Sequence, residues 1–419
     1  MGQVEHRPRS ATPPAATRRD IRTRASGYLE VPPRVPACGY VPAWIDPCAR
    51  VASLSLTAPS WRDCGEMSAS EVTEVARPNS VQRVSVESLK ADLVLAGGGV
   101  KGIGHAGAVA KLREASYEFP RVAGTSAGAI VGALVAAGMT PTRMKEVIKD
   151  LNWQRFRDRS LLDRIPLLGP AASVLFEYGV YEGNYVREWL GNELADLKVT
   201  TFADLRSNDW QGDPNDDEAY KLVVMAADIT RGQLIRLPWD YHQYGLKPAE
   251  QLVVDAVRAS TSIPIFFEPV TLRHANGKSS TLVDGGVLSN YPIDVFDRTD
   301  GCVPRWPTFG VTLLPRLPEG NIQLFPLLGA LRRRGFPRFM ESLVTTMVVG
   351  RDQGYLAKPW VEARTIEVNT ERVGITEFGV DDAGEDALYE SGRSKTATFL
   401  DKWNFEAYKA RFRAPQTGA

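Results

Sequence analysis

Cysteine and histidine are scarce in this chain of 419 residues, which contains four of each. The cysteines are too few and too scattered for a disulfide framework; they stand at Cys38, Cys48, Cys64 and Cys302. No Cys-x-x-Cys pair and no cluster of histidines indicates a zinc site. We therefore expect neither a metal nor another cofactor, and a reducing, intracellular compartment is the default.

The chain also lacks net charge and a targeting segment. Lysine plus arginine equals aspartate plus glutamate, with 50 residues in each group, which argues against a nucleic-acid partner bound by bulk charge. The first ten residues lead into no apolar segment, so no secretory signal is predicted. His6 occupies the position where a myristoylation motif has serine or threonine. These absences predict a cytoplasmic protein without a signal peptide or a transmembrane helix.

Composition divides the chain into two regions. Residues 1–88 are rich in proline and arginine and hold no apolar period, which predicts a disordered leader. A basic arm that touches anionic lipid is the alternative, and Met67 could serve as a second start. Residues 89–419 have an ordinary globular pattern and predict one domain, with a motif-bearing core at about 92–298 and a C-terminal extension at 299–419.

Apolar runs of strand length alternate with helical patterns in the second region. Residues 92–96 form a short apolar run, which leads through a glycine-rich loop into a helical pattern at 103–115. This alternation predicts an α/β fold with parallel strands. Further strands are expected at 222–227, 233–237, 281–283, 308–313 and 364–368, and further helices at 144–151, 183–197, 248–260, 340–350 and 385–403.

Residues 124–128 read GTSAG, a GxSxG pattern. A serine nucleophile suits a sharp turn from a strand to a helix, and such a turn brings the positions two before and two after the serine together. Glycine at 124 and 128 meets that demand. A chance match and an uncharged membrane helix over 122–139 are the alternatives. Gly124, Thr125 and Ser126 are a poor helix interior, which favours the turn.

Three glycine-rich sites follow expected strands, at 97–102, 124–128 and 284–286. Because strand ends of a parallel sheet gather at one crevice, we expect the three sites to meet there. Together they would supply a serine nucleophile, a carboxylate base and backbone N–H groups for an oxyanion, as acyl transfer needs. The first loop also matches GxGxxG, so a dinucleotide-binding enzyme with Glu118 on the ribose stays open.

The motifs GGGVKG, GTSAG and DGGVLSNYP, in this order, resemble the patatin-like phospholipase family. The resemblance is strongest over 92–292, and 176–183 and 258–270 look like bacterial members. It implies a three-layer α/β/α fold with a mainly parallel central sheet. It also implies a serine lipid acyl hydrolase that cleaves phospholipid or lysophospholipid esters through an acyl-enzyme, with a Ser–Asp dyad and no metal.

Carried over by motif, Ser126 is the nucleophile and Asp284 its base. The resemblance places the oxyanion hole on Gly97, Gly98, Gly99 and the amide of Ala127. It gives the tight turns of the three motifs to Gly102, Gly124, Gly128, Gly285 and Gly286. Lys101, in the variable part of the first loop, either meets a lipid phosphate or faces solvent. A non-catalytic lipid-binding or storage protein on the same fold is a further alternative.

Only His105 stands near a motif among the four histidines, and we interpret it as a helix-packing residue rather than a base. His6 falls in the leader, and His242 and His274 fall in expected loops. An aspartate can replace histidine as the base when a partly apolar pocket raises its pKa.

Two apolar segments are candidates for peripheral contact with a membrane. Residues 161–180 are apolar and broken by prolines, and 325–339 interleave apolar residues with an arginine cluster at 332–334. The second pattern suits an anionic lipid surface. A core wall and an exposed helix end are the respective alternatives. Neither pattern indicates a protein partner.

Overall fold

Eight strands form one sheet in the part of the chain that the computed structural model describes. The described residues are 88–151, 183–207, 216, 219–264, 267–300, 302–313, 353–370 and 381–413. The strands of the sheet are β2 (Asp92–Leu95), β4 (Val122–Thr125), β5 (Leu222–Asp228), β6 (Gln233–Leu237), β7 (Val270–Arg273), β8 (Ser279–Asp284), β9 (Thr308–Thr312) and β10 (Thr365–Glu367). A separate parallel pair joins β1 (Leu89–Lys90) to β3 (Tyr117–Glu118).

The sheet is mainly parallel, as predicted. β10, β9, β2, β4 and β5 lie side by side in this order and all run in the same direction. β6 and β8 each run antiparallel to β5, and β7 runs antiparallel to β8. The expectation that all three glycine sites follow parallel strands is therefore wrong for the third. β8 runs the opposite way and ends at Asp284, opposite Ala226 of β5.

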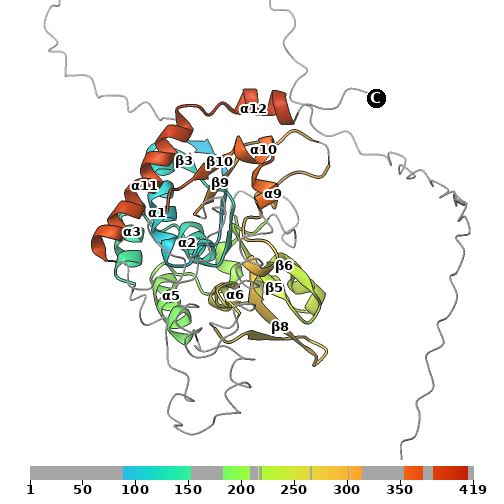
Figure 1. The fold of residues 1–419 in the computed structure, drawn as a ribbon. Helices are drawn as coiled ribbons and strands as arrows, with labels where there is room; N and C mark the ends of the chain where they lie inside the picture. The colour runs from blue at the N-terminus through green and yellow to red at the C-terminus, as the bar shows by residue number, and fades with distance from the viewer. Residues whose placement is uncertain are drawn as a thin grey trace, which may run out of the picture. The chain divides into compact units, whose positions relative to one another are not determined.

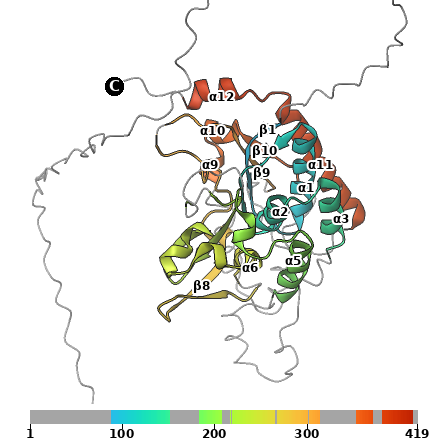
Figure 2. The ribbon, with the colours of Figure 1, turned by 180° about the vertical axis from the view of Figure 1, so that it is seen from behind.

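Helices cover both faces of the sheet (Figures 1 and 2). Their bounds are α1 (Ile103–Glu114), α2 (Ala127–Ala136), α3 (Pro141–Lys149), α5 (Asn184–Asp196), α6 (Val253–Ser260), α9 (Gln353–Leu356), α10 (Pro359–Glu362), α11 (Asp382–Leu400) and α12 (Phe405–Phe412). In both views α1, α3 and α11 lie on one side of the strands, and α9 and α10 lie on the other. The connection from β2 to β4 through α1 and the connection from β9 to β10 through α9 and α10 run in opposite directions across the sheet. Because both crossovers are right-handed, their helices lie on opposite faces.

The central strands are buried on both faces, which is why they are continuous apolar runs in the sequence. Every residue of β2, β4, β5 and β9 is buried. Asp92 is the charged residue at the start of β2, and the Arg121 side chain pairs with it through two nitrogens at 3.1 and 2.5 Å. A buried carboxylate is tolerated here because both of its oxygens accept hydrogen bonds.

The C-terminal part of the chain completes the same core. β9 and β10 extend the sheet beyond β2, and α11 packs lengthwise against α1 (Figure 1). A Cβ on Gly107 would lie 2.0 Å from the carbonyl oxygen of Tyr389, and one on Gly392 would lie 2.2 Å from that of Gly104. The two helices therefore approach at backbone distance. Residues beyond 299 thus support the helix that follows the first glycine loop.

Most expected elements are present, with differences at the edges. The helix expected at 248–260 is broken into a 3-10 turn, Pro248–Glu250, and α6. The break occurs because Leu252 forms a β-bridge with Thr201. β7 and α12 were not expected; β7 is a sheet-edge strand without a fully buried residue.

Several sequence-based expectations fall outside the described residues. They are the leader apart from residue 88, the helix at 340–350, and the two segments expected at a membrane, 161–180 and 325–339. The alternative of a membrane helix at 122–139 is wrong, because this stretch forms β4, a turn and α2 inside the fold. Among the described helices, none combines the length and apolar character needed to cross a bilayer.

Candidate active site

Ser126 lies on a sharp turn between β4 and α2, in a strained backbone conformation with φ 53° and ψ −123°. L-residues other than glycine rarely adopt a positive φ, and such strain is concentrated at functional sites. The flanking glycines make the turn possible. A Cβ on Gly124 would lie 2.2 Å from the carbonyl oxygen of Gly128, and one on Gly128 would lie 2.2 Å from that of Leu95. The two glycines stand in close contact, as the GxSxG pattern predicts.

Asp284 is buried at the end of β8 and is 2% exposed. Its Oδ1 accepts a hydrogen bond from the Gly286 N–H at 2.7 Å. Burial raises the pKa of this carboxyl to about 7, while the Ser126 side chain and the Gly286 N–H lower it less. Ser126 is thus close enough to affect the carboxylate, although Oδ2 has no hydrogen bond of regular geometry with any described residue. Such bonds are often loose before substrate binds.

The end of α6 connects the serine to the aspartate, a role that sequence reasoning missed. The Ser260 hydroxyl accepts the N–H of Ser126 at 2.9 Å. The carbonyl oxygen of Ser262 accepts the N–H of Asp284 at 2.8 Å. Arg258 secures the segment by donating to the Ser262 hydroxyl at 2.5 Å. The only signal in the sequence was the resemblance of 258–270 to bacterial relatives, which does not assign these contacts.

The first glycine loop lies against Asn290 of the third motif. The N–H of Gly97 donates to the carbonyl oxygen of Asn290 at 3.1 Å, and the Asn290 amide donates back to the Gly97 carbonyl oxygen at 3.1 Å. Gly97 therefore has its N–H engaged. The N–H groups of Gly98, Gly99 and Ala127 have no acceptor among the described residues. These three groups are the ones free to bind an oxyanion.

His105 is fully buried on α1, and its Nε2 donates to the carbonyl oxygen of Ala96 at 2.8 Å. Burial lowers its pKa to about 4, so the ring is neutral at pH 7. The bond fixes the chain directly before the glycine loop. The Nε2 of His274 and the Ser280 hydroxyl oxygen form a hydrogen bond of 3.0 Å at the hairpin of β7 and β8. The histidine on α1 packs as interpreted, and in the described structure neither ring is hydrogen-bonded to the serine or the aspartate.

Lys101 does not face solvent, contrary to one of the two expectations. It is 1% exposed, and its Nζ donates to the Thr370 hydroxyl at 2.9 Å. The 3-10 turn at Gly99–Gly102 carries this side chain beneath the C-terminal part of the chain. Thr370 in turn donates to the carbonyl oxygen of Leu313 after β9. The lysine therefore anchors the glycine loop to the far end of the sequence.

Metal ligands, and the Glu118 side chain that a dinucleotide-binding enzyme would need, do not gather at the glycine loop in the described part of the chain. Within the described ranges no group of three or more histidine, cysteine, aspartate or glutamate side chains could hold an ion. Glu118, which a dinucleotide-binding enzyme would need beside the glycine loop, lies on β3. β3 pairs with β1, directly before β2 begins, whereas the loop follows the end of β2. The acidic residue and the loop are thus at opposite ends of the strand.

Comparisons with known proteins agree with these features. The family described as patatin-like phospholipase matches residues 93–297. The uncharacterized protein YqhO of Bacillus subtilis is 35% identical over 319 residues, which cover 75% of this chain and 99% of that protein. An uncharacterized NTE family protein of Mycobacterium tuberculosis is 29% identical over 329 residues, and the match covers 74% of this chain and 46% of the relative. The chain thus spans less than half of the mycobacterial protein.

Solved structures show more distant likenesses. VipD from Legionella pneumophila is 20% identical with a TM-score of 0.42, over 74% of this chain and 66% of that one. The type III effector ExoU is 15% identical with a TM-score of 0.39, over 75% and 53%. The near-complete match to YqhO and the match of the family description to the three-motif region show that this chain belongs to the patatin-like phospholipase family.

Proposed function

We propose that this chain is a serine lipid acyl hydrolase that cleaves carboxylic ester bonds of phospholipids or lysophospholipids. Ser126 is the nucleophile and Asp284 is its base. The observation that carries the proposal is the strained turn at Ser126, with the buried Asp284 carboxyl close enough for the two to interact. Strain of this kind persists only where the surrounding structure enforces it.

The first step is attack on the ester carbonyl by the Ser126 oxygen. Asp284 accepts the hydroxyl proton, and the carbonyl oxygen becomes an oxyanion. The N–H groups of Gly98, Gly99 and Ala127 stabilise this charge, and one such donor is typically worth about 2.7–4 kcal/mol. Ala127 begins α2, so the positive end of the helix dipole faces the same charge. The lipid alcohol then leaves with the proton from Asp284, and an acyl-enzyme remains.

The second half of the cycle repeats these roles with water. Asp284 takes a proton from water as it attacks the acyl-enzyme, and returns it to Ser126 when the fatty acid leaves. A pKa of about 7 lets one carboxyl act as base and then as acid at neutral pH. Burial gives the carboxyl this property, so the dyad needs no imidazole.

The lipid substrate is inferred from the family and from the demands of the reaction. A phospholipid ester lies below its head group, so the enzyme has to dock on the bilayer. We propose peripheral docking through the segment at 325–339, whose arginines at 332–334 suit anionic lipid. Each basic residue near such a surface is worth about 1 kcal/mol.

A fluorophosphonate probe tests the nucleophile, and a panel of lipids tests the substrate. Peptide mapping of the labelled wild type should place the adduct on Ser126, and Ser126→Ala should take no label. A storage protein on this fold would hydrolyse no lipid, and a dinucleotide enzyme would take no label. Label on another residue, or hydrolysis by a folded Ser126→Ala protein, would end the proposal.

A further inference from the structure

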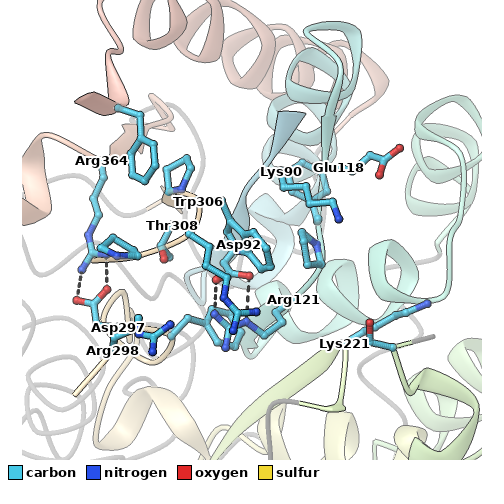
Figure 3. A pocket seen from close by; sticks show the side chains of 18 of the residues that line it. Lys90, Asp92, Glu118, Arg121, Lys221, Asp297, Arg298, Trp306, Thr308 and Arg364 are labelled. Atoms are coloured by element: carbon cyan, nitrogen blue, oxygen red, sulfur yellow. Dashed lines mark hydrogen bonds and ion pairs between the residues drawn. The ribbon is translucent and has the colours of Figure 1, made fainter. Parts of the chain in front are cut away.

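A cavity, shown from close by in Figure 3, lies where the parallel strands begin, whereas Ser126 lies where β4 ends. Its volume is about 340 Å³. It is lined by the first residue of each of the five parallel strands or by the residue just before it: Asp92, Lys221, Arg121, Thr308 and Arg364. Because Ser126 follows the end of β4 and Arg121 precedes its start, the cavity is separate from the active site.

Cationic side chains outnumber carboxylates around this cavity. Eight lysines and arginines line it, but only three acidic residues do. The cations are Lys90, Arg113, Arg121, Lys221, Arg298, Arg305, Arg364 and Arg413, and the acids are Asp92, Glu118 and Asp297. The whole chain carries no net charge, so this local excess is specific to the cavity.

Two of the three carboxylates are already neutralised by ion pairs, which Figure 3 marks with dashed lines. Asp92 pairs with Arg121. Asp297 accepts from Arg364 at 2.6 and 2.8 Å and also contacts Arg413. Arg298 pairs with Asp300, which is outside the lining, so Glu118 is the carboxylate of the lining that faces the remaining cations, Lys90, Arg113, Lys221 and Arg305.

Arg113 is the cation whose position is hardest to explain without a ligand. It is half-buried, its guanidinium lies 4.8 Å from the centre of the Phe119 ring, and burial lowers its pKa. Its guanidinium forms no hydrogen bond or ion pair with a described residue; Glu118 acts on it only at longer range. A partly desolvated charge without a hydrogen-bond acceptor is costly. An anion in the cavity would offset that cost.

Lys90 and Trp306 add a second cation and a flat aromatic surface to the lining of the same cavity. Lys90 lies opposite Glu118 in the strand register of β1 and β3, and Glu118 also acts on Arg113 at longer range. The Lys90 ammonium lies 5.9 Å from the centre of the Trp306 ring. Arg305, next to Trp306, is exposed and has no ion-pair partner among the described residues. The cavity therefore combines unpaired cations with an aromatic face.

We propose that this cavity binds a small phosphate monoester, with Arg113 and Lys90 holding the phosphate beside Trp306. Arginine presents a fork of donors that matches phosphate oxygens, and lysine adds a point charge. The monoester could be a nucleotide or the head group of a lipid. The aromatic face favours the ring-bearing source, because a base can stack on Trp306.

Isothermal titration calorimetry on the full chain tests the site with three probes. They are inorganic phosphate, glycerol 3-phosphate and adenosine 5′-monophosphate. We expect saturable binding of both esters, with the nucleotide tighter; tighter glycerol 3-phosphate would support the same site with a head group as its source. If neither ester shows saturable binding at concentrations up to about 10 mM, the proposal is overturned.

Matched variants then tie binding to the cavity. Arg113→Gln with Lys90→Gln should weaken both esters at least about tenfold, which equals the loss of one charge-assisted contact of about 1.4 kcal/mol. Arg273→Gln with Lys278→Gln removes the same two charges from the exposed hairpin of β7 and β8 and should change nothing. If the cavity pair and the hairpin pair behave alike, phosphate binding is non-specific and the proposal fails.

A third variant keeps the test valid if the Arg113 change prevents folding. Lys90 is exposed, so Lys90→Glu should fold and still lose binding of both esters. Trp306→Leu should weaken the nucleotide more than glycerol 3-phosphate. Unchanged binding by a folded Lys90→Glu protein would refute the assignment of the phosphate.

Discussion

Replacing Asp284 by asparagine should remove esterase activity and at the same time stabilise the protein at neutral and alkaline pH. The fold holds this carboxyl in a buried position that raises its pKa from 3.8 to about 7. Asparagine has nearly the same shape but carries no charge at any pH. The amide cannot accept the serine proton, so the catalytic loss and the gain in stability have one origin.

The sign of the stability change follows from proton binding. The folded state binds the Asp284 proton more tightly than the unfolded state, so the carboxyl favours folding most at low pH. As pH rises from about 4 to about 7, the unfolded chain ionises first and this advantage disappears. At about 1.36 kcal/mol per pKa unit, the change amounts to roughly 4 kcal/mol in total, and to about 3 kcal/mol between pH 5 and pH 8.

Urea unfolding at pH 5 and pH 8 measures this difference. The free energy of unfolding of Asp284→Asn, relative to wild type, should rise by about 3 kcal/mol from pH 5 to pH 8. Asp196→Asn, at the exposed end of α5, serves as the control and should show no such trend. If the free energies of unfolding of wild type and Asp284→Asn differ by the same amount at both pH values, the raised pKa of the Asp284 carboxyl is refuted.

The same carboxyl predicts the pH dependence of turnover. The value of kcat/KM should fall about tenfold per pH unit below pH 7, and so about a hundredfold at pH 5, because only the ionised form accepts the proton. A 4-nitrophenyl ester serves as substrate, with each aliquot adjusted to one alkaline pH before reading. A flat profile between pH 5 and pH 7, or substantial turnover by folded Asp284→Asn, would contradict the assignment of the base.

Ser126→Ala should lower kcat by at least about a thousandfold on the same ester while its unfolding curve stays close to wild type; near-normal turnover would exclude the nucleophile. His105→Ala should lower the free energy of unfolding by about 1–3 kcal/mol, because a buried carbonyl loses its donor. Its kcat/KM should still fall below pH 7 as in the wild type; a folded, inactive His105→Ala protein would indicate a histidine mechanism. Gly124→Ala should cost at least about 3 kcal/mol, because its Cβ would lie 2.2 Å from a carbonyl oxygen, whereas Gly191→Ala on α5, whose nearest atom is at 3.8 Å, should gain about 0.5–1 kcal/mol; equal unfolding curves would refute the packing argument. Replacing the arginines at 332–334 by glutamine should lower binding and hydrolysis of anionic vesicles without changing turnover of the short ester, and unchanged vesicle binding would exclude that segment as the docking surface.

Local chemistry in the sequence was enough to identify the fold class and the motif residues. Apolar runs at β2, β4 and β5 are long enough for strands and are buried on both faces, so they are recognisable without any contact information. The turn at Ser126 is equally local, because the backbone there excludes a Cβ at the positions two residues before and after the serine. Such demands fall on single positions and leave a visible pattern.

The contacts that connect these motifs have no such pattern. The bond from Ser126 to Ser260 spans 134 positions, that from Asn290 to Gly97 spans 193, and that from Lys101 to Thr370 spans 269. A serine near a helix end and a lysine in a glycine loop each suit solvent as well as they suit a buried contact. Their roles depend on which distant segment packs against them.

Tertiary structure also decided the electrostatics. The sequence pointed to Asp284 as a candidate base, but its pKa of about 7 follows from burial at the end of a strand that runs against its neighbour. The cation-lined cavity arises in the same way, because residues that begin five separate strands meet only when the sheet forms. Burial and charge density are properties of the assembled sheet, and no short stretch of the chain contains them.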